Sequence, residues 1–453
     1  MNTALYMGVQ ALNATQAALD ATSNNIANSN TPGYTREVAQ FSENAENFSG
    51  GTVSGGGVTL NGIQSVRDEL LNLQIQQQTS QQSSADTVSS SLQSVQTLFS
   101  STGADIASTL SAFSSSLVQL SASPTSTASQ QSVLTAGQNL AQSFHTTADG
   151  LTSAQSAADQ QVTQTVAQIN TLTQQIAQLN SQLSSSVTSQ QNGGSIQDQR
   201  DELVQQLSKL TGVSVTQGSD GQVITTANGT PLVMGGKSFS LQTTTGTDGF
   251  QHVLDSNGKD ITTAIQGGQL GGAIQVRDQV IPGLLNSLNT LATQFAAAFN
   301  TAQTQGFDAS GNAGQAFFSL PASPGGAAAG ISVALTSGSQ VAISSDGSPG
   351  SNGNVSKLSA ALTSTLPSGQ TPANAYSSLV YKVGSDISNA NAQSSALGQS
   401  ILQLTNQQSS VSGVSIDEES TNLIRYQTAY EAAARIVSTI QALSEVTINM
   451  VAP

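Results

Sequence analysis

The sequence predicts a mainly α-helical protein with a small β insertion, built from terminal coiled-coil helices, an elongated helical bundle and a β-rich domain. Three observations predict this class. Apolar residues recur every seven positions at both ends of the chain, the segment 129–187 keeps the same spacing, and short runs of β-branched residues separated by turn signals lie between residues 212 and 265. Seven-residue spacing is typical of packed helices, and short β-branched runs are typical of strands.

The first helix is expected to carry a coiled-coil seam. Its seam residues are Leu5, Leu12, Leu19 and Ile26, with alanines alongside. The helix should end near Asn30, because Pro32 disfavours helical geometry in the residue before it. Pro32 and Gly33 then suit the two central positions of a type II turn.

The middle of the chain is expected to form the bundle. Residues 42–62 are rich in Gly, Ser and Asn and are expected to form a flexible or hairpin-like loop. Apolar periodicity then predicts helices over 64–99, 105–120, 129–187, 274–303 and 373–411. Between Arg67 and Arg200 the sequence has no Lys or Arg. Since Glu–Lys pairs cannot support these helices, they must be held by packing against one another.

A β-rich insertion interrupts the helical pattern. Strands are expected over 213–215, 223–226, 232–234, 239–241 and 250–254. Asp220-Gly221 is a hairpin turn signal between the first two strands, and Asn257-Gly258 is a turn signal after the last one. Two further short strands, over 331–335 and 340–344, are expected in a Gly- and Ala-rich segment.

The last helix, expected over 417–450, mirrors the first. Its apolar residues fall on two neighbouring seams, with Leu423, Tyr430 and Val437 on one and Tyr426, Ala433 and Ile440 on the other. Periodicity alone leaves three arrangements open. The terminal helices could pair within one chain, pair with copies in neighbouring chains, or pack on the central bundle.

These patterns divide the chain into four parts. The expected parts are a terminal coiled-coil layer (1–41 and 412–453), a helical-bundle body (42–211, 266–305 and 356–411), a β-rich insertion (212–265) and a Gly/Ala-rich segment with short strands (306–355).

Residues suited to catalysis or metal binding are scarce. His145 and His252 lie far apart in the sequence and are interpreted as structural or surface residues. Asp417-Glu418-Glu419 opens the last helix, where acidic side chains complement the helix dipole. The segment 255–260 lacks the terminal Glu of a calcium loop, and the Gly-rich stretches lack the Lys of a phosphate loop. We therefore expect no enzyme activity, no catalytic or metal site and no cofactor.

The composition limits the partners. Of 453 residues, 11 are Lys or Arg and 26 are Asp or Glu, which gives a net charge of −15. Nucleic acid and anionic membrane surfaces are disfavoured as partners, because both are bound through Lys and Arg. The sequence has no cysteine, which excludes disulfides, and its N-terminus lacks the basic start and apolar block of a secretory signal. If the protein is exported, we expect a route without a cleaved signal peptide.

Five segments carry a resemblance to a known family. Residues 28–36, Asn-Ser-Asn-Thr-Pro-Gly-Tyr-Thr-Arg, resemble the N-terminal signature of the axial proteins of the bacterial flagellum, which rod, hook and hook-associated proteins share. Four further blocks are similar to segments of the hook-associated protein 1 family and fall in that family's order. They are Asp198-Gln199-Arg200-Asp201-Glu202-Leu203, 267–272 followed by Arg277-Asp278, 306–308 with 314–318, and 412–419 running into 422–430.

The resemblance implies a structural protein at the junction between hook and filament. The terminal helices would form an inner coiled-coil layer around the axial channel, the helical bundle would form the next layer, and the β-rich domain would face outward. The expected assembly residues are the seams Leu5, Leu12, Leu19 and Ile26 on one helix and Leu423, Tyr426, Tyr430, Val437 and Ile440 on the other.

Two family motifs add further expected site residues. The turn of Asn28, Asn30, Thr31, Pro32, Gly33 and Tyr34 is expected both to redirect the chain and to contact the subunit below. The bundle motif comprises Asp198, Gln199, Arg200 and Asp201.

The resemblance also implies partners and a location. The partners are further copies of the chain in a ring at the hook tip, the hook protein, a second hook-associated protein on the filament side and an export chaperone at the C-terminal region. Subunits of the family leave through the flagellar export channel without a cleaved signal, so the expected location is extracellular. The β insertion is short here and a further outer domain is reduced or missing, so functions of an outer surface are not carried over.

Two other interpretations remain at this point. Another axial protein, such as hook or distal rod, shares the N-terminal signature but lacks the block at Asp198 and the long bundle before it. A secreted helical adhesin or effector of a related export system would also lack a signal peptide and would suit acidic, Gln- and Ser-rich helices. That class does not explain the ordered set of axial motifs.

Overall fold

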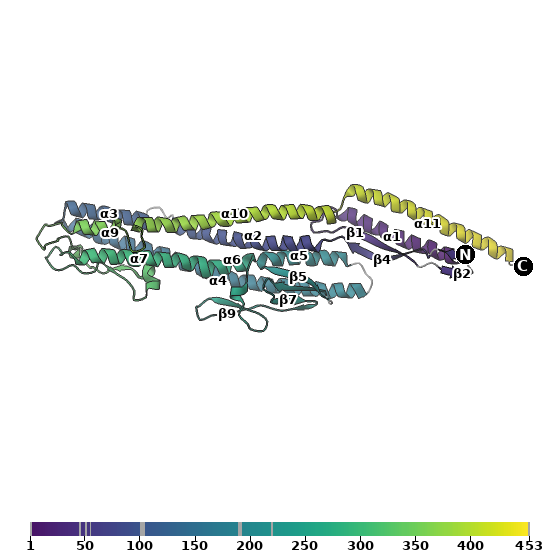
Figure 1. Ribbon diagram of the computed structural model, residues 1–453, viewed down its shortest axis with the longest axis horizontal. Coiled ribbons are helices and arrows are strands. Elements are labelled where there is room, and N and C mark those ends of the chain that lie inside the picture. The colour runs from purple at the N-terminus through teal and green to yellow at the C-terminus, as the bar shows by residue number, and fades with distance from the viewer. Residues whose placement is uncertain are drawn as a thin grey trace.

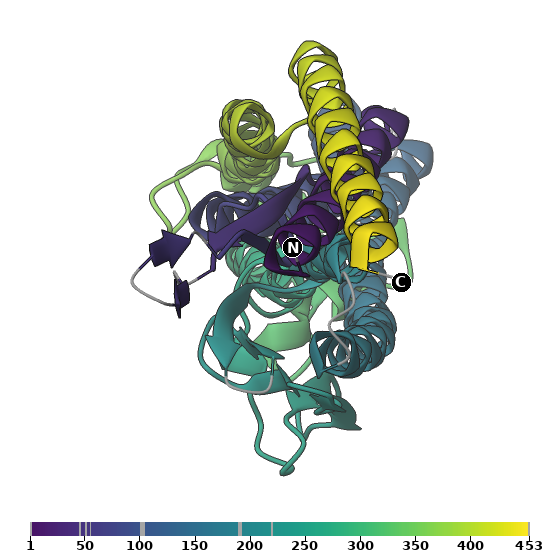
Figure 2. The same ribbon diagram turned by 90° about the vertical axis from the view of Figure 1, so that its right-hand side faces the viewer.

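The computed structural model describes residues 2–44, 47–49, 52–54, 56–99, 105–188, 193–218 and 221–451. The molecule is elongated, with a long helical bundle at one end and a narrower part formed by the two ends of the chain at the other (Figure 1). Both termini lie at the same tip of this narrow part, and the β-rich insertion lies along one side of the bundle (Figures 1 and 2). The predicted class, mainly α with a small β insertion, is confirmed.

Long helices dominate the bundle, and shorter ones fill the spaces between them. Its helices are α2 (Glu69–Gln96), α3 (Ile106–Ala122), α4 (Thr127–Thr188), α5 (Gly194–Leu210), α6 (Gly268–Gln275), α7 (Ile281–Thr304), α8 (Ala327–Gly330), α9 (Val355–Thr363) and α10 (Pro372–Ser412). The 62-residue helix α4 confirms the helix expected over 129–187. A π-helix, η3 (Val276–Val280), joins α6 to α7. The sequence pattern did not predict α9, because a nine-residue helix carries few apolar repeats.

A cluster of phenylalanines fills the end of the bundle farthest from the termini. Phe113, Phe295, Phe299, Phe317 and Phe318 are almost fully buried, with ring centroids 4.8–6.2 Å apart. Each buried ring contributes roughly 1.5–3 kcal/mol. Aromatic residues make up only 4% of the chain. Five of them pack together here and form a compact hydrophobic core at this end of the bundle.

Half-buried amide side chains attach the irregular segments to the helices. Asn300 of α7 accepts hydrogen bonds from the backbone N–H groups of Phe317 and Phe318 and donates one to the Phe318 carbonyl, at 2.7–2.8 Å. Asn170 of α4 binds the N–H and carbonyl of Leu241 in the same way, both at 2.8 Å. A neutral amide can satisfy backbone donors and acceptors together. Helices with very few charges therefore still hold their loops in place.

The β-rich insertion comprises two small sheets. One is the antiparallel sheet of β5 (Val213–Gly218), β6 (Gly221–Thr226), β7 (Pro231–Met234) and β8 (Lys237–Ser238), and the other pairs β9 (Gln242–Thr245) with β10 (Gln251–Leu254). Four of the five expected strands are confirmed. The strand expected over 239–241 is wrong, because Asn170 takes the backbone groups of Leu241. The first residue of the predicted Asp220-Gly221 turn lies outside the described residues.

In the segment 306–355, one of the two expected strands forms. β12 (Ser332–Val333) pairs with β11 (Phe318–Ser319). The strand expected over 340–344 is wrong, since this stretch begins in the 3₁₀ turn η5 (Gly338–Gln340). The side chain of Gln303 donates to the Gln340 carbonyl and accepts from the Ala342 N–H, so these backbone groups are satisfied without a neighbouring strand.

One buried arginine anchors the β-rich insertion to the bundle. Arg277 of the π-helix is 1% exposed. It forms ion pairs with Asp159 of α4 at 2.7 Å and with Asp278 at 2.6 Å, and donates to the Gln251 carbonyl of β10 at 2.6 Å. Asp159 also accepts from the Gln251 N–H. The buried guanidinium is thus bound by two carboxylates and a carbonyl, in keeping with the rule that buried charges are paired.

The glycines before this π-helix are explained by close packing. A Cβ at Gly272 of α6 would lie 2.7 Å from the carbonyl oxygen of Ser84 in α2. Gly268 has φ +64°, and a Cβ there would lie 2.4 Å from the backbone of Leu210. Both neighbours are backbone atoms that cannot move aside. The Gly-rich motif therefore lets α6 approach α2 and the end of α5.

The narrow part of the molecule contains both terminal helices and a hairpin. It consists of α1 (Asn2–Asn28), β1 (Glu37–Glu43), β2 (Asn47–Ser49), β3 (Thr52–Ser54), β4 (Val58–Ser65) and α11 (Ile416–Val451). β1 and β4 pair antiparallel, and both pack on α1. The hairpin alternative for 42–62 is therefore correct. In the structure this stretch lies with the terminal helices, although the sequence pattern assigned it to the bundle body.

The expected start of the second helix at residue 64 is wrong. β4 continues to Ser65, and α2 begins at Glu69 after Asp68, whose side chain accepts hydrogen bonds from the N–H groups of Leu70 and Leu71. An aspartate N-cap satisfies donors that the first turn leaves unpaired. Strand pairing and this cap together set the boundary.

His252 of the β-rich insertion lies between two aspartates, a cluster that we call the histidine clamp. This cluster should make the local stability depend on pH. His252 contacts Asp260 at 2.6 Å and Asp248 at 3.2 Å. Its hydrogen bonds to Asp260 and then to Asp248 raise the pKa of His252 above 6.5, while the hydrogen bond from His252 lowers the pKa of Asp260 to about 2. The raised pKa adds stability that is complete below about 6.5 and is lost as the pH rises through the raised value. The lowered pKa of Asp260 adds stability that is complete above about 4 and is lost as the pH falls towards about 2.

We therefore expect the tip to be most ordered between about pH 4 and 6.5. NMR titration of the His252 ring protons should give a pKa above 6.5 in the folded chain, and Asp260→Asn should lower it. An unchanged titration curve in Asp260→Asn would contradict the clamp.

Candidate functional site

The turn after α1 has the predicted geometry. Thr31 accepts a hydrogen bond from the Tyr34 N–H at 3.2 Å, and Gly33 has φ +80° between them. Asn28 ends α1, donating from its side chain to the Asn24 carbonyl at 3.0 Å and accepting from the Thr31 hydroxyl at 3.3 Å. Asn30, Thr31, Pro32 and Gly33 are exposed, and Tyr34 points back towards α1. The turn therefore redirects the chain and presents four residues on the surface.

Replacing Gly33 by valine is expected to cost about 1–2 kcal/mol of stability in the turn, because a β-branched residue disfavours positive φ. A side chain at this position meets no atom within 4 Å, so the cost is purely conformational. Gly33→Asn is the matched control, since asparagine tolerates this conformation. Urea unfolding of both variants checks the prediction. An unchanged free energy of unfolding in Gly33→Val would contradict a requirement for positive φ.

Asn25, at the end of α1, is the hub of this region. It is 1% exposed and uses every hydrogen-bonding position of its amide. Its nitrogen donates to the Glu37 carbonyl at 2.8 Å and to the Glu419 carboxylate at 3.0 Å. Its oxygen accepts from the Glu37 N–H at 2.9 Å and from the Tyr34 hydroxyl at 2.8 Å. One side chain thus joins α1, the turn, β1 and α11.

The electrostatics around this hub keep Tyr34 neutral. Burial is the main cause that raises the pKa of Tyr34, and the charges of Glu37, Asp198 and Glu419 raise it further. A neutral phenol can donate to the amide oxygen of Asn25 over the whole physiological range. The Tyr34 hydroxyl therefore keeps its proton and remains a hydrogen-bond donor to Asn25.

The turn is tied to the bundle through Asp198. This residue of α5 accepts hydrogen bonds from the Thr35 hydroxyl at 2.6 Å and from the Thr35 N–H at 3.2 Å. Arg67, which precedes α2, forms ion pairs with both Asp198 and Asp201. Arg200 lies 3.3 Å from Asp201 and is buried, and this burial lowers its pKa. Gln199 lies on the exposed side of α5.

The start of α11 also contacts this region. Arg36 forms an ion pair with Glu418 at 3.2 Å, and its N–H donates to the carbonyl of Ser412 at the end of α10. Asp417, Glu418 and Glu419 occupy the first turn, as expected for residues that complement the helix dipole. That interpretation missed a second role, because Glu419 is 3% exposed and bound to Asn25.

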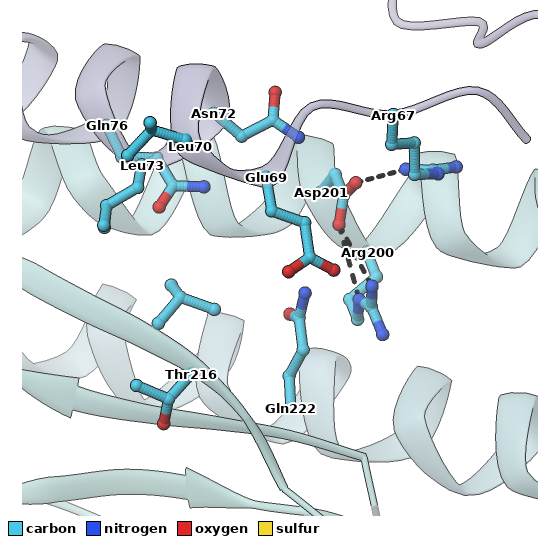
Figure 3. A pocket seen from close by; sticks show the side chains of 11 residues that line it. Arg67, Glu69, Leu70, Asn72, Leu73, Gln76, Arg200, Asp201, Thr216 and Gln222 are labelled. Carbon is cyan, nitrogen blue, oxygen red and sulfur yellow. Dashed lines mark hydrogen bonds and ion pairs between the residues drawn. The ribbon is translucent and has the colours of Figure 1, made fainter.

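We call this set the joint: Asn25, Tyr34, Thr35, Arg36, Glu37, Arg67, Asp198, Asp201, Glu418 and Glu419. The joint adjoins two hollows of about 340 and 290 Å³. Figure 3 shows the first, with Arg67 and Arg200 converging on Asp201 and Gln222 reaching in from the β-rich insertion. The second lies beside Pro32 and Gly33.

The terminal helices pair with each other within the chain. α1 and α11 run antiparallel along the narrow part (Figure 1). The predicted seam residues of both helices are half-buried: Leu5, Leu12, Leu19, Ile26, Leu423, Tyr426, Tyr430, Val437 and Ile440. Among the described side chains of α1, the buried ones are Asn25 and five small residues outside the four predicted seam positions: Gly8, Ala14, Ala18, Ala21 and Thr22.

A row of apolar side chains on α11 remains exposed. It comprises Ile436, Leu443, Val446 and Met450, which share one face of the helix and are 53–83% exposed. α11 has 36 residues and α1 has 27. The last turns of α11 therefore present an apolar surface that α1 does not cover.

The part of the chain that the structure describes contains no group of three or more side chains suited to a metal ion. Among its helices, none is long and apolar enough to cross a membrane.

Comparisons with known proteins identify the class. Residues 5–35 match the family model of the flagella basal body rod protein, and residues 406–450 match that of the flagellar basal body rod FlgEFG protein C-terminal region. Residues 92–318 match the flagellar hook-associated protein FlgK helical domain. The terminal pair, the joint and these matches define an axial structural protein of the bacterial flagellum.

Relatives narrow the class to one family. The flagellar hook-associated protein 1 of Bacillus subtilis (strain 168) is 30% identical, with 99% of this chain and 98% of the relative covered. That of Escherichia coli (strain K12) is 27% identical over 99% of this chain and 100% of the relative. The chain belongs to the flagellar hook-associated protein 1 family, the structural components of the hook–filament junction.

A solved structure shares the fold. The flagellar hook junction protein FlgK from Burkholderia pseudomallei superposes with a TM-score of 0.67 at 19% identity, covering 75% of this chain and 100% of that one.

Proposed function

We propose that this chain joins hook to filament by assembling through its terminal helix pair, with the joint fixing that pair to the bundle. The exposed apolar row on α11 is the observation that supports the proposal. Water-exposed apolar surface of this kind marks a site of association. The occupants we propose are the terminal helices of further copies, in a ring at the hook tip.

Family membership supports a proposal for the other partners. We propose contacts with the hook protein on one side and with a second hook-associated protein on the filament side. The exposed turn residues Asn30, Thr31, Pro32 and Gly33 are suited to the subunit below, because no other part of the chain covers them in the described structure. We propose no catalytic activity and no cofactor, since the contacts of the joint are hydrogen bonds and ion pairs.

The exposed apolar row on α11 also bears on export of the chain. We propose that the chain travels through the flagellar channel without a cleaved signal and acts outside the cell. An export chaperone would bind the C-terminal region and cover Leu443, Val446 and Met450 until assembly. Covering an apolar helix face in this way prevents premature association.

The first experiment is electron microscopy of cells that lack this protein, with filament protein assayed in the medium. We expect bare hooks and unassembled filament subunits. Intact filaments would contradict the junction role and would favour the adhesin interpretation.

A second experiment tests the apolar row. The double variant Ile436→Asp with Leu443→Asp should fail to restore filaments, while its purified bundle unfolds normally. The matched control, Ser438→Asp with Gln441→Asp, adds the same charge at exposed polar positions of the same helix. Filaments restored by the first variant would exclude the row as an assembly surface.

A further inference from the structure

The buried apolar side chains of the bundle divide into two cores. The distal core, in the half of the bundle farthest from the termini, includes residues of α2, α3, α7, α9 and α10 together with the phenylalanine cluster. The proximal core includes residues of α5, α6 and the β-rich insertion, which lie nearer the narrow part of the molecule (Figure 1). Helix α4 contributes to both cores. Neither core includes a described residue of α1 or α11, so neither depends on contacts with the terminal helices.

The border between the two cores is sharp. On α4, Ala158 is the last buried apolar residue of the distal core and Val162 is the first of the proximal core. Where α6 continues into the π-helix η3, Ile274 belongs to the proximal core and Val276 to the distal core. The border therefore crosses the bundle near the middle of α4 and at the start of the π-helix.

Polar contacts join the two cores at this border. Asp159 of α4 forms the 2.7 Å ion pair with the buried Arg277 of η3. Arg277 also donates to the Gln251 carbonyl of the insertion, and its own carbonyl accepts from the side chain of Gln155 at 2.8 Å. We call these four residues, Gln155, Asp159, Gln251 and Arg277, the arginine latch. Charged and polar groups thus occupy a place where one continuous core would have apolar contacts.

A hollow of about 530 Å³ lies at the same border. Its walls include Val88 and Leu92 of the distal core, and also Gln266 and Gly267, which connect the insertion to α6. Apolar contact between the two cores is therefore interrupted by space as well as by polar groups.

Helices α2 and α10 continue past the border without contributing to the proximal core. After Ala390, α10 has no buried residue as far as its end at Ser412. Its contacts with α2 in this stretch include the hydrogen bond from the Ser394 hydroxyl to Asp86 at 2.5 Å. Water competes for exposed hydrogen bonds of this kind, so each contributes little to stability. The two helices therefore couple the halves of the bundle only weakly.

The two cores are expected to differ in stability. Apolar burial is the main source of cooperative stability, and each core buries its apolar surface largely within itself. Opening the proximal core would therefore expose little of the distal core. The proximal core is the smaller one, and its members in the described part of the chain include no aromatic residue. It buries less apolar surface and should open at a lower free energy.

We propose that the bundle consists of two cooperative folding units, one around each core, which meet at the arginine latch. The proximal unit, which carries the β-rich insertion, opens while the distal unit remains folded. Proteins commonly open in such contiguous cooperative units. The consequence for export rests on the function proposed above: in a chain that passes through a channel, unfolding would begin in the proximal unit.

Hydrogen exchange of the purified full-length chain, followed by mass spectrometry at low urea concentrations, tests the two units. Leu288 of α7 belongs to the distal core and Leu207 of α5 to the proximal core, and both are 0% exposed. Leu288→Ala should raise exchange of the best-protected distal amides by about thirtyfold or more and leave the proximal amides unchanged. Leu207→Ala is the matched control. It should raise exchange of the proximal amides by a similar factor, because they exchange through opening of their own unit.

A uniform rise in both halves of the bundle for Leu288→Ala would overturn the proposal, since a single cooperative unit responds as a whole. Proximal amides that do not respond to Leu207→Ala would also overturn it, because they would then exchange by local fluctuation. Leu288→Val leaves a smaller cavity than Leu288→Ala, and it replaces that variant if the larger cavity prevents folding.

Arg277→Met tests the latch. The proximal amides should exchange about a hundredfold faster or more, as expected when one partner of a buried ion pair is removed. The control Lys382→Met breaks the ion pair with Asp386, whose side chains are 58% and 29% exposed, and should leave exchange unchanged. Unchanged proximal exchange in Arg277→Met would exclude the latch as the link between the units. Exchange is measured on the purified chain, so failure of the filament assay would count against the proposed function and not against the two units.

Discussion

Replacing Arg277 by methionine is expected to lower the free energy of unfolding by about 3–5 kcal/mol, the cost of breaking a buried ion pair by removing one partner. Methionine fills most of the volume, so packing is nearly conserved. The loss is therefore electrostatic. Asp159 would remain largely buried with a negative charge, and the carbonyl of Gln251 would lose its donor. Asp278 contributes less, because its side chain is 36% exposed.

The measurement is urea unfolding of the purified chain followed by circular dichroism. The control is Arg425→Met, which removes an exposed arginine from α11 and should cost less than about 1 kcal/mol. Hydrogen exchange should show the largest loss of protection in β9 and β10, which Arg277 attaches to α4. A loss below about 1 kcal/mol for Arg277→Met would contradict the anchoring role.

Replacing Arg67 by methionine is expected to uncouple the terminal helices from the bundle, at a cost of about 2–3 kcal/mol. This is less than for Arg277, because the side chains of Arg67 and Asp198 are 14% and 13% exposed and that of Asp201 is 27% exposed, so that water screens part of the interaction. Without Arg67, the carboxylates of Asp198 and Asp201 would repel each other. Asp198 would then hold Thr35 less firmly.

A double-mutant cycle separates these effects. Adding Asp198→Asn to Arg67→Met removes the repulsion, so the double variant should be more stable than the two single losses predict. Spin labels on exposed positions of α5 and α11 should show a broader distance distribution in Arg67→Met. An unchanged distribution and a strictly additive cycle would together exclude the ion pair as the link.

The motifs that suggested the family proved to be parts of one joint, although their sequence positions did not reveal this. Asp198 meets Thr35 across 163 residues, and Asn25 meets Glu419 across 394. No local pattern distinguishes Asn25 from the other asparagines of α1. Its role follows from four hydrogen bonds that exist only after the chain has folded. Arg67 and Glu419 were missed for the same reason.

The sequence by itself determined the long helices, the turn at Pro32 and Gly33 and the position of the β-rich insertion. Periodicity, proline geometry and turn residues act over a few neighbours, so they can be read directly along the chain. Tertiary structure alone decided which helices pair, in which register, and where marginal segments begin and end. Segment 239–241 forms no strand because Asn170 binds the backbone of Leu241. Residue 64 lies in β4, which ends at Ser65, and α2 begins only after the Asp68 cap. Small residues rather than leucines fill the centre of the terminal pair. These outcomes depend on hydrogen-bond partners and close contacts that distant segments supply.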